Sequence, residues 1–453
     1  MPTLGRTAIV AGRSMGGLAA AAALASWFDN VLIIDRDAPD ADGDSRTGVG
    51  QGHHVHNLQK GGELAIESLL PGTRGAMIAA GAVEFTQGLQ TRFYDHGYWL
   101  PNRDVGYANL AASRWLLEAV VRDSLLRKSN VSLRGNLSLQ DIQFSTPDRV
   151  SGIVVENEGG VSELLEADLI VDCTGRGSRV RSHLVEHGYE AVPEFAIDMG
   201  ISYTSAFFDA PRDALGGAAV LAVLPRPPHK RGAFVSLVED GRWLVSLHTR
   251  FEKAVPESHD DMVRFAASIE VPEVEQFIRS AVLAGPVRSY RKPHATWRRF
   301  DKVERFPAGL LVLGDAITSF NPVYGQGMSV AWQQASALHQ ILAARASSGS
   351  GLEGLASEFF PAAMKFSREA WNASTLVDAA YDEVTGDTPP GAEQGLVFLG
   401  ALRTLLADDP DLHRDYLGVA QMTSPAAALM TPERMARVMA AVASAPGQPG
   451  ANP

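Results

Sequence analysis

The chain has 453 residues, 45% of them hydrophobic, which is enough apolar material for two to three globular domains. Its 40 lysines and arginines against 52 acidic residues give a net charge of -12 without a basic cluster, which argues against a nucleic-acid partner. The single cysteine, Cys173, excludes an internal disulfide and a multi-cysteine metal site, and no apolar run is long enough to cross a membrane, so we expect a cytoplasmic protein.

The N-terminal segment predicts a strand, a helix and a second strand. Thr7–Ala11 and Val31–Ile34 are short apolar runs, and the stretch Met15–Trp27 between them is helix-forming and rich in small residues. A helix that joins two such strands makes a βαβ unit, in which the strands are parallel.

A glycine loop connects the first strand to this helix. The sequence GRSMGG, from Gly12 to Gly17, follows the dinucleotide-binding pattern G-x-G-x-x-G, except that Ser14 stands at the middle glycine. Because the serine side chain is small, the backbone can still approach a phosphate, and the hydroxyl can donate to that phosphate. Asp35 ends the second strand eighteen residues beyond Gly17, close to where an acid accepts hydrogen bonds from an adenosine ribose.

The segment that follows is a glycine-broken loop from Arg46 that runs into an amphipathic helix ending near Leu70. Its histidine cluster, His53, His54 and His56, has no carboxylate partner at a recognisable spacing, so we predict packing and hydrogen bonding beside a cofactor and no metal site.

Two further segments have ligand-binding features. Ser113 is the expected N-cap of a helix that reaches Leu126, and Arg114 in its first turn is either a surface charge or a phosphate contact. The apolar run Leu169–Asp172 predicts a buried strand, and it meets the small-residue turn Thr174–Ser178, which can bring backbone against a ligand.

The middle of the chain predicts antiparallel strands. Apolar and polar residues alternate in two segments, Gly232–Val238 and Arg242–Arg250, on either side of a turn at Glu239 to Gly241. This pattern indicates a hairpin, and Met199–Phe208 predicts another strand. The aromatic side chains of this sheet are either part of an ordinary core or the lid of an apolar pocket. Four of them are candidates for contact with substrate. Because neighbouring residues of a strand point to opposite faces, we expect about half of the four to touch substrate. They are Tyr203, Phe207, Phe234 and Trp243.

The chain then returns to a parallel pattern. Leu310–Leu313 predicts a buried strand that ends at Gly314 and Asp315, followed by a Pro/Gly loop and a helix that begins near Gly327. The free N–H groups of that helix start suit an anionic ligand edge. Residues 352–443 read as largely helical, and the Pro/Gly-rich stretch 444–453 is expected to be disordered.

Taken together, the segments GRSMGG with Asp35, DCTGRGSRVR and GDAITSFNPVYGQGMS resemble the FAD-dependent monooxygenases of the aromatic-hydroxylase superfamily over nearly the whole chain. Within it, RTGVGQGHHVH, SRWLLEAVVR, DCTGRGS and the last segment are most similar to bacterial flavin epoxidases of polyether polyketide biosynthesis, relatives of squalene epoxidase.

The resemblance implies a set of FAD-binding residues. Gly12, Ser14 and Gly17 would line the pyrophosphate, and Asp35 would hold the adenosine ribose. Arg114 would reach the phosphates and Asp315 the ribityl hydroxyls or a phosphate. Pro322, Gly325 and Gly327 would lie under the isoalloxazine. The complete implied set is Gly12, Ser14, Met15, Gly17, Asp35, Arg36, Arg46, His54, Arg114, Thr174, Gly175, Gly314, Asp315, Pro322, Gly325, Gly327 and Met328. Two residues depart from the family pattern: Ser14 replaces a glycine, and Thr174 stands where many members have the aspartate of an Asp-Gly motif, which puts a direct role there in NADPH binding in doubt.

The expected fold is α/β, with a Rossmann-like FAD-binding domain, an inserted mixed or antiparallel sheet domain for substrate, and a C-terminal helical region. The expected FAD-binding domain is discontinuous, with residues 1–85, 105–185 and 300–345. The substrate domain takes residues 86–104 and 186–299, and the helical region residues 346–443.

The implied reaction is oxygen transfer from a flavin C4a-hydroperoxide to a carbon-carbon double bond of a large apolar substrate, polyketide- or terpenoid-like, with FAD as cofactor. NAD(P)H would be the reductant, directly or through a flavin reductase. The sequence contains no persuasive base for a phenol, which favours epoxidation over aromatic hydroxylation, and no catalytic side chain is assigned.

An isoprenoid-reducing flavoprotein and a non-enzymatic flavin sensor stay as alternatives. A flavin halogenase would show a W-x-W pair, which the seven tryptophans never form.

Overall fold

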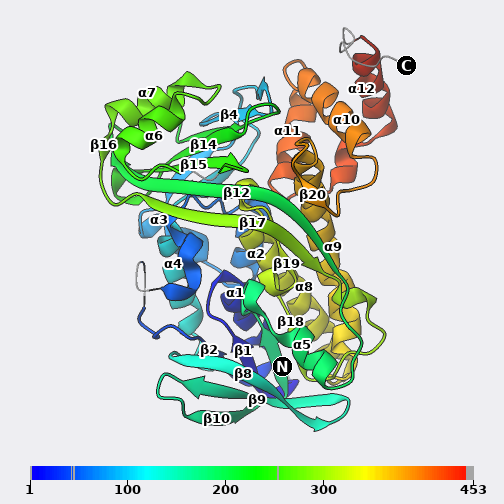
Figure 1. Ribbon diagram of the computed structural model, residues 1–453. Helices are drawn as coiled ribbons and strands as arrows, with labels where there is room; N and C mark the ends of the chain where they lie inside the picture. The colour runs from blue at the N-terminus through cyan, green and yellow to red at the C-terminus, as the bar shows by residue number, and fades with distance from the viewer. Residues whose placement is uncertain (1–2, 42, 44–45, 253–254, 445–453) are drawn as a thin grey trace.

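The structure of the protein is a computed structural model that describes residues 3–41, 43, 46–252 and 255–444. Within these residues, five strands form a parallel sheet in the order β18-β11-β1-β2-β7. Their bounds are β1 Gly5–Ala11, β2 Phe28–Ile34, β7 Val131–Arg134, β11 Leu169–Asp172 and β18 Leu310–Val312. The sheet confirms the predicted Rossmann-like layer of an α/β fold (Figure 1).

Helix α1 (Met15–Leu24) joins β1 to β2 and packs against α8 (Gly327–Ser348). Its run of alanines is almost wholly buried, because small side chains let the helix lie close to the sheet and to α8 at once. The prediction extended this helix to Trp27, but α1 ends at Leu24. Just beyond that end, the indole N–H of Trp27 donates to His339 Nδ1 of α8 at 3.2 Å.

The remaining short elements of this half of the molecule surround the parallel sheet. The helices are α2 Lys60–Leu69, α3 Thr73–Ala79, α4 Arg114–Leu126 and α5 Val180–Glu186, and the strands β3 Val83–Thr86 and β6 Ala108–Ala111 pair antiparallel. Ser113 is the N-cap of α4, as predicted, and its hydroxyl accepts a hydrogen bond from Leu116 N.

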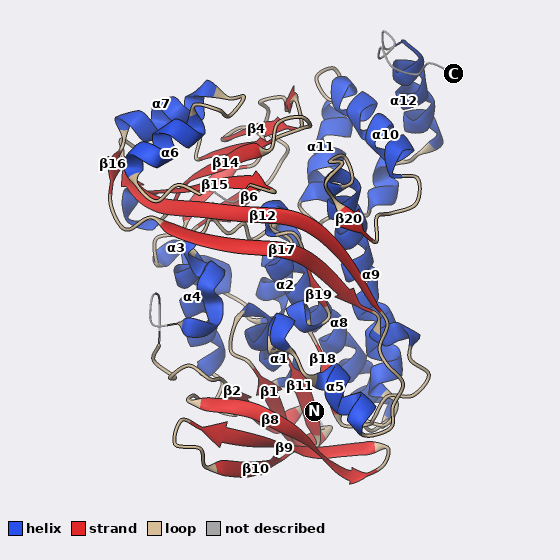
Figure 2. Ribbon diagram, viewed as in Figure 1, coloured by secondary structure: helices blue, strands red, loops and turns tan. Residues whose placement is uncertain are grey.

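A three-stranded antiparallel sheet lies beyond the parallel sheet at the bottom of Figure 2, near the N-terminus. It consists of β8 (Leu137–Thr146), β9 (Arg149–Asn157) and β10 (Ser162–Glu166). These strands lie within residues 105–185 of the expected FAD-binding domain, for which no strands had been predicted between Leu126 and Leu169.

A second large sheet, with ten strands in the described residues, contains the predicted hairpin. Its path is β19-β17-β12-β15-β14-β13-β4-β5, and β16 and β20 pair with β12. The bounds are β4 Thr91–Asp95, β5 Tyr98–Trp99, β12 Glu194–Asp209, β13 Val220–Leu224, β14 Arg231–Leu237, β15 Trp243–Arg250, β16 Val282–Leu283, β17 Arg288–Arg298, β19 Thr318–Ser319 and β20 Thr385–Gly386. The sheet is mixed, because β4 pairs parallel with β13 while the other pairs are antiparallel.

The two faces of this mixed sheet have different roles. Helices α6 (His259–Ala266) and α7 (Pro272–Ser280) cover the outer face, where Phe208, Trp243 and Phe277 belong to one hydrophobic core (Figure 1). The inner face is turned toward the parallel-sheet half of the molecule, and the long strands β12 and β17 cross above α2 and α8 in the same view.

The C-terminal region is helical, as predicted. Its helices are α9 Leu355–Asp378, α10 Ala392–Leu405, α11 Pro410–Ala420 and α12 Pro432–Ser444. The loop between α9 and α10 contains β20, which pairs with β12. Except for Ser444, the tail 444–453 that was expected to be disordered lies outside the described residues.

No helix in the described part of the chain is long and apolar enough to span a bilayer.

Candidate functional site

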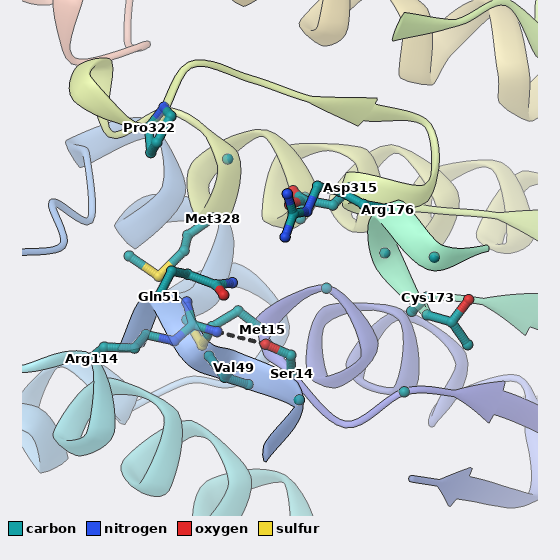
Figure 3. A pocket seen from close by; sticks show the side chains of 18 of the residues that line it. Ser14, Met15, Val49, Gln51, Arg114, Cys173, Arg176, Asp315, Pro322 and Met328 are labelled. Carbon is teal, nitrogen blue, oxygen red and sulfur yellow. Dashed lines mark hydrogen bonds between the residues drawn. The ribbon is translucent and has the colours of Figure 1, made fainter. Parts of the chain in front are cut away.

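A cavity of about 720 Å³ lies where the parallel strands end and the mixed sheet begins. Its lining comes from segments far apart in the sequence, including the starts of α1 and α8 and the inner face of β12 and β17. Figure 3 shows side chains from several of these segments converging on the space between them. Ligands of open parallel sheets bind at the carboxyl ends of the strands, so this is the expected position for a cofactor.

The turn before α1 has backbone geometry that only glycine supports. Gly12 has a φ of 100°, and a Cβ there would lie 2.6 Å from the carbonyl oxygen of Cys173. A Cβ on Gly17 would lie 1.7 Å from the Gly12 carbonyl oxygen, so α1 could not approach the turn. Ser14 is the N-cap of α1 and makes no side-chain capping bond, which leaves the first helical N–H groups free for an anion.

Asp35 lies at the end of β2 with both carboxylate oxygens held. Arg13 N donates to Oδ2 at 2.7 Å, and Asp37 N donates to Oδ1 at 3.0 Å. The side chain lines the cavity beside Arg36. A carboxylate fixed by backbone donors is a well-oriented acceptor for a ribose hydroxyl.

Arg114 is buried and faces the glycine loop, which favours the ligand-contact interpretation over a surface charge. Its guanidinium donates to Ser14 Oγ at 2.7 Å and to Glu118 Oε2 at 2.8 Å (Figure 3). Arg46 forms a second ion pair with Glu118 at 3.3 Å and another with Asp37 at 3.1 Å. The two arginines therefore bring positive charge to the start of α1, and the buried carboxylates keep them in position.

The second helix terminus at the cavity belongs to α8. Gln326 is its N-cap without a side-chain capping bond, and Gly327 and Met328 line the cavity. Before it, the turn Pro322–Tyr324 ends at Gly325, whose φ is 64°. Figure 3 shows Pro322 and Met328 along this side and Asp315 facing the space between α8 and α1.

A buried carboxylate from α9 holds this turn. Asp378 accepts hydrogen bonds from Asn321 Nδ2 at 2.9 Å and from the Tyr324 hydroxyl at 2.9 Å, and it pairs with Arg250 of β15 at 2.7 Å. Arg250 and Asp378 are 3% and 0% exposed, so the ion pair is enclosed. Asp378 thus links three elements, α9, β15 and the turn Pro322–Tyr324, through its hydrogen bonds and its ion pair.

The mixed sheet contributes polar side chains to the cavity wall. His54 Nδ1 lies 2.7 Å from Ser205 Oγ of β12, and Tyr203, two residues before Ser205, also lines the cavity. From β17, Tyr290 lines the cavity, and Lys292 Nζ donates to Ser319 Oγ at 2.6 Å. Tyr290 and Lys292 were not predicted to lie in the site, because nothing in the local sequence of β17 indicates which strand lies beside it.

Most of the residues predicted to bind the cofactor line this cavity. The exceptions are Gly17 and Gly314, which shape the turns behind the lining. Those that line it are Gly12, Ser14, Met15, Asp35, Arg36, Arg46, His54, Arg114, Thr174, Gly175, Asp315, Pro322, Gly325, Gly327 and Met328.

Of the four aromatic residues predicted for a substrate pocket, Tyr203 lines the cavity and Trp243 does not. The prediction for Trp243 is wrong, because Trp243 pairs with Phe208 and points to the outer face, where its ring lies 5.2 Å from that of Phe277. The side chains of Phe207 and Phe234 point to the same inner face as Tyr203, but they do not line the cavity.

The three clustered histidines have separate environments. The His53 ring packs edge-on against Trp115, His54 contacts Ser205, and His56 Nδ1 lies 2.9 Å from the His54 carbonyl oxygen. Among the described residues, no group of three or more His, Cys, Asp or Glu side chains is arranged to hold a metal ion.

These features fit the FAD that the family resemblance implies. Two uncapped helix starts, a close glycine turn and the buried Arg46 and Arg114 suit a pyrophosphate, and the fixed Asp35 suits a ribose. His54 Nε2 and Gln326 Oε1 are buried in the wall without a hydrogen-bond partner among the described residues, as expected for groups that bind a ligand.

Comparison with known proteins agrees with this fit. Residues 7–368 match the FAD binding domain family. The chain is 31% identical over 396 residues to Protein Rv3254 of Mycobacterium tuberculosis, which covers 84% of this chain and 82% of that protein.

Two solved structures are similar in fold. A flavoprotein/dehydrogenase from Cytophaga hutchinsonii superposes with a TM-score of 0.69 at 14% identity, covering 96% of this chain and 98% of that one. The p-nitrophenol 4-monooxygenase PnpA from Pseudomonas putida gives a TM-score of 0.64 at 17% identity, covering 94% and 99%. On the match over most of its length, this chain belongs to the FAD binding domain family.

Proposed function

We propose that this protein is a flavin-dependent monooxygenase that transfers one atom of molecular oxygen to a carbon-carbon double bond of a large apolar substrate, giving an epoxide. One observation carries the choice of an alkene. The described carboxylates that line the cavity are Asp35 and Asp315, and neither is paired with a histidine or tyrosine there as a general base.

The histidines of the cavity support the same choice. Burial, with a smaller effect from His53, lowers the pKa of His54 to about 4, and burial together with Arg114 lowers the pKa of His56 to about 3. Both rings are therefore neutral near pH 7 and too weakly basic to deprotonate a phenol efficiently. An alkene needs no such deprotonation before it accepts an electrophilic oxygen.

Lys292 is the remaining candidate base. Burial lowers its pKa to about 8, but its Nζ donates to Ser319 Oγ at 2.6 Å and to the Phe320 carbonyl oxygen at 2.5 Å. Those acceptors favour the protonated amine, so we assign Lys292 to positioning the loop before Pro322.

The roles of the chain's own residues follow from their positions. Asp35 would bind the ribose, and Arg114 with the start of α1 would bind the pyrophosphate. The start of α8 would stabilise negative charge at the flavin edge, because its free N–H groups and helix dipole act together. When bound, FAD supplies the electrons and the activation of oxygen, while the protein orients the substrate and excludes water.

We propose NAD(P)H as the reductant, delivered directly or through a flavin reductase, in the cytoplasm. Arg176 and Arg179 line the cavity from exposed positions next to Thr174, and their charge suits an anionic nucleotide that binds transiently. Oxidation of NADH and of NADPH by the purified holoenzyme, with and without an added reductase, distinguishes the two routes.

The decisive experiment incubates the holoenzyme, a reductant and labelled molecular oxygen with a terpenoid or polyketide alkene, and in parallel with a phenol. Mass spectrometry should find one labelled oxygen atom in an epoxide. Incorporation from water would contradict a monooxygenase, and turnover of the phenol alone, with ring hydroxylation, would replace epoxidase by aromatic hydroxylase. Saturation of the double bond without oxygen consumption would indicate an isoprenoid-reducing flavoprotein.

A further inference from the structure

A short chain of hydrogen bonds reaches from the backbone to His54. Val55 N lies 2.7 Å from Ser246 Oγ, Ser246 Oγ lies 2.5 Å from Ser205 Oγ, and Ser205 Oγ lies 2.7 Å from His54 Nδ1. Ser205 and Ser246 are each 1% exposed, so water does not compete for these bonds.

The chemistry of the donors sets the direction of this chain. A backbone N–H only donates, so Ser246 accepts from Val55 and must give its own hydroxyl hydrogen to Ser205. Ser205 in turn donates to His54 Nδ1. In the opposite order the hydrogen of the buried Ser246 hydroxyl would point to neither of its two partners, Val55 N and Ser205 Oγ.

The tautomer of His54 follows from this order. Because Nδ1 accepts, a neutral ring must have its proton on Nε2. Burial favours the neutral ring, since it lowers the pKa of His54 to about 4. His54 therefore presents an N–H donor from Nε2.

This donor has no partner among the described residues, although His54 is 5% exposed and lines the cavity. Beside it, the ring centroid of Tyr203 lies 5.5 Å away, and the Tyr203 hydroxyl is equally buried and unpartnered. A buried donor without an acceptor destabilises the protein, so two of them in one cavity wall indicate a ligand that accepts hydrogen bonds there.

We propose that His54 Nε2–H and the Tyr203 hydroxyl form a donor pair that binds a neutral carbonyl-type oxygen, either of the flavin ring or of the substrate. For the substrate, this deepens the proposed function: the alkene would also have a ketone, ester or amide group. Uncharged donors in a buried wall select a carbonyl over a hydrocarbon, and they do not supply the full charge that a buried carboxylate requires.

The first test measures the tautomer in the holoenzyme labelled with ¹⁵N-histidine. Long-range proton-nitrogen correlation spectra should show His54, assigned by its loss in His54→Phe, as the neutral Nε2–H form at pH 7. Ser205→Ala should remove the Nδ1 hydrogen bond and shift that nitrogen signal. A protonated ring, or a proton on Nδ1, would overturn the proposal.

The second test measures binding without turnover. FAD affinity is followed by flavin fluorescence, and affinities for a long-chain methyl ketone and the alkane of equal length are followed by changes in flavin absorbance. His54→Phe and Tyr203→Phe each remove one donor, and Tyr189→Phe is the matched control because its hydroxyl donates to the Pro147 carbonyl oxygen outside the cavity lining.

Each donor should contribute about tenfold in affinity. If the substrate supplies the oxygen, the two variants weaken the ketone alone; if the flavin supplies it, they weaken FAD. Unchanged FAD affinity together with an unchanged preference for ketone over alkane would overturn the donor pair. Neither readout requires epoxidation, so failure of the proposed reaction would be seen separately.

Discussion

Ser14 explains how the glycine loop can depart from its pattern. In the structure its hydroxyl accepts from Arg114, so the serine orients a cation toward the place where the middle glycine would allow a phosphate to approach. The substitution therefore adds a contact and keeps a small side chain at the start of α1.

We expect Ser14→Gly to keep FAD affinity within about tenfold, because Arg114 still pairs with Glu118 and the backbone still approaches the pyrophosphate. Ser14→Leu should abolish binding by filling that space. Fluorescence titration of both apoproteins measures the difference, and equal affinity of the two variants would contradict a pyrophosphate at this loop.

His248 gives a pH dependence that is independent of FAD chemistry. It is 1% exposed, and burial, together with Arg250, lowers its pKa to about 3. The unfolded chain binds this proton near the ordinary pKa of 6.5, so the unfolded state gains protons first as pH falls. The stability that neutral His248 provides is complete above about pH 6.5 and is lost progressively toward pH 3.

Between pH 7.5 and pH 5, the wild type should therefore lose about 2 kcal/mol more free energy of unfolding than His248→Gln. Urea denaturation at both pH values, with saturating FAD, measures this difference. His294→Gln is the control, since its side chain is 59% exposed, and it should follow the wild type. A His248→Gln variant with the full wild-type pH dependence would contradict the assignment.

At the scale of elements, β-strand register decides which aromatic side chains meet the cavity. Tyr203 pairs with His248 and Phe208 with Trp243, so the side chains of Tyr203 and Trp243 lie on opposite faces. The hairpin was predictable from its alternation, but the pairing of β12 with β15 was not, because it joins strands more than thirty residues apart.

Helix α9 reaches the cofactor region through Asp378, ten residues beyond the family match. We expect Asp378→Asn to lower the free energy of unfolding by about 3 to 5 kcal/mol, because Arg250 would remain charged and buried without its counterion. FAD affinity should fall as well, since an amide has one acceptor oxygen where the carboxylate has two to hold Asn321 and Tyr324 in their turn.

The control for this variant is Asp148→Asn, which breaks an ion pair with Arg305 whose side chains are 76% and 62% exposed. An exposed pair contributes under about 1 kcal/mol, so this change should be nearly neutral. If Asp378→Asn were equally mild in urea denaturation, α9 would not hold the turn.

At the scale of the whole molecule, the cavity joins the two large sheets, since its lining runs from Ala11 to Ala331 and includes both. FAD should therefore stabilise the whole fold, by about 2.7 kcal/mol at a hundredfold excess over its Kd. Thermal unfolding should show a Tm that rises with FAD concentration.

Asp315→Ala should require about ten- to a hundredfold more FAD for the same rise, because it removes an acceptor at the cavity wall. Asp213→Ala, at an exposed position, should follow the wild type. A Tm unaffected by FAD in the wild type would contradict a cofactor site between the two sheets.

The sequence by itself determined the local units of this protein. Strand, glycine turn and helix follow from apolar runs and from residues such as Gly12, whose φ of 100° no other residue adopts easily, and the hairpin at Glu239–Gly241 follows from alternation. These features depend on neighbours along the chain, so they are present in the sequence pattern.

Only the tertiary structure decided which distant side chains meet. Arg114 reaches Ser14 across a hundred residues, Lys292 and Tyr290 enter the cavity from a strand without a motif, and Asp378 fixes a turn from another helix. Trp243 faces away for the same reason. Such contacts depend on strand register and on how buried surfaces pack together, and a residue's sequence neighbours do not specify either.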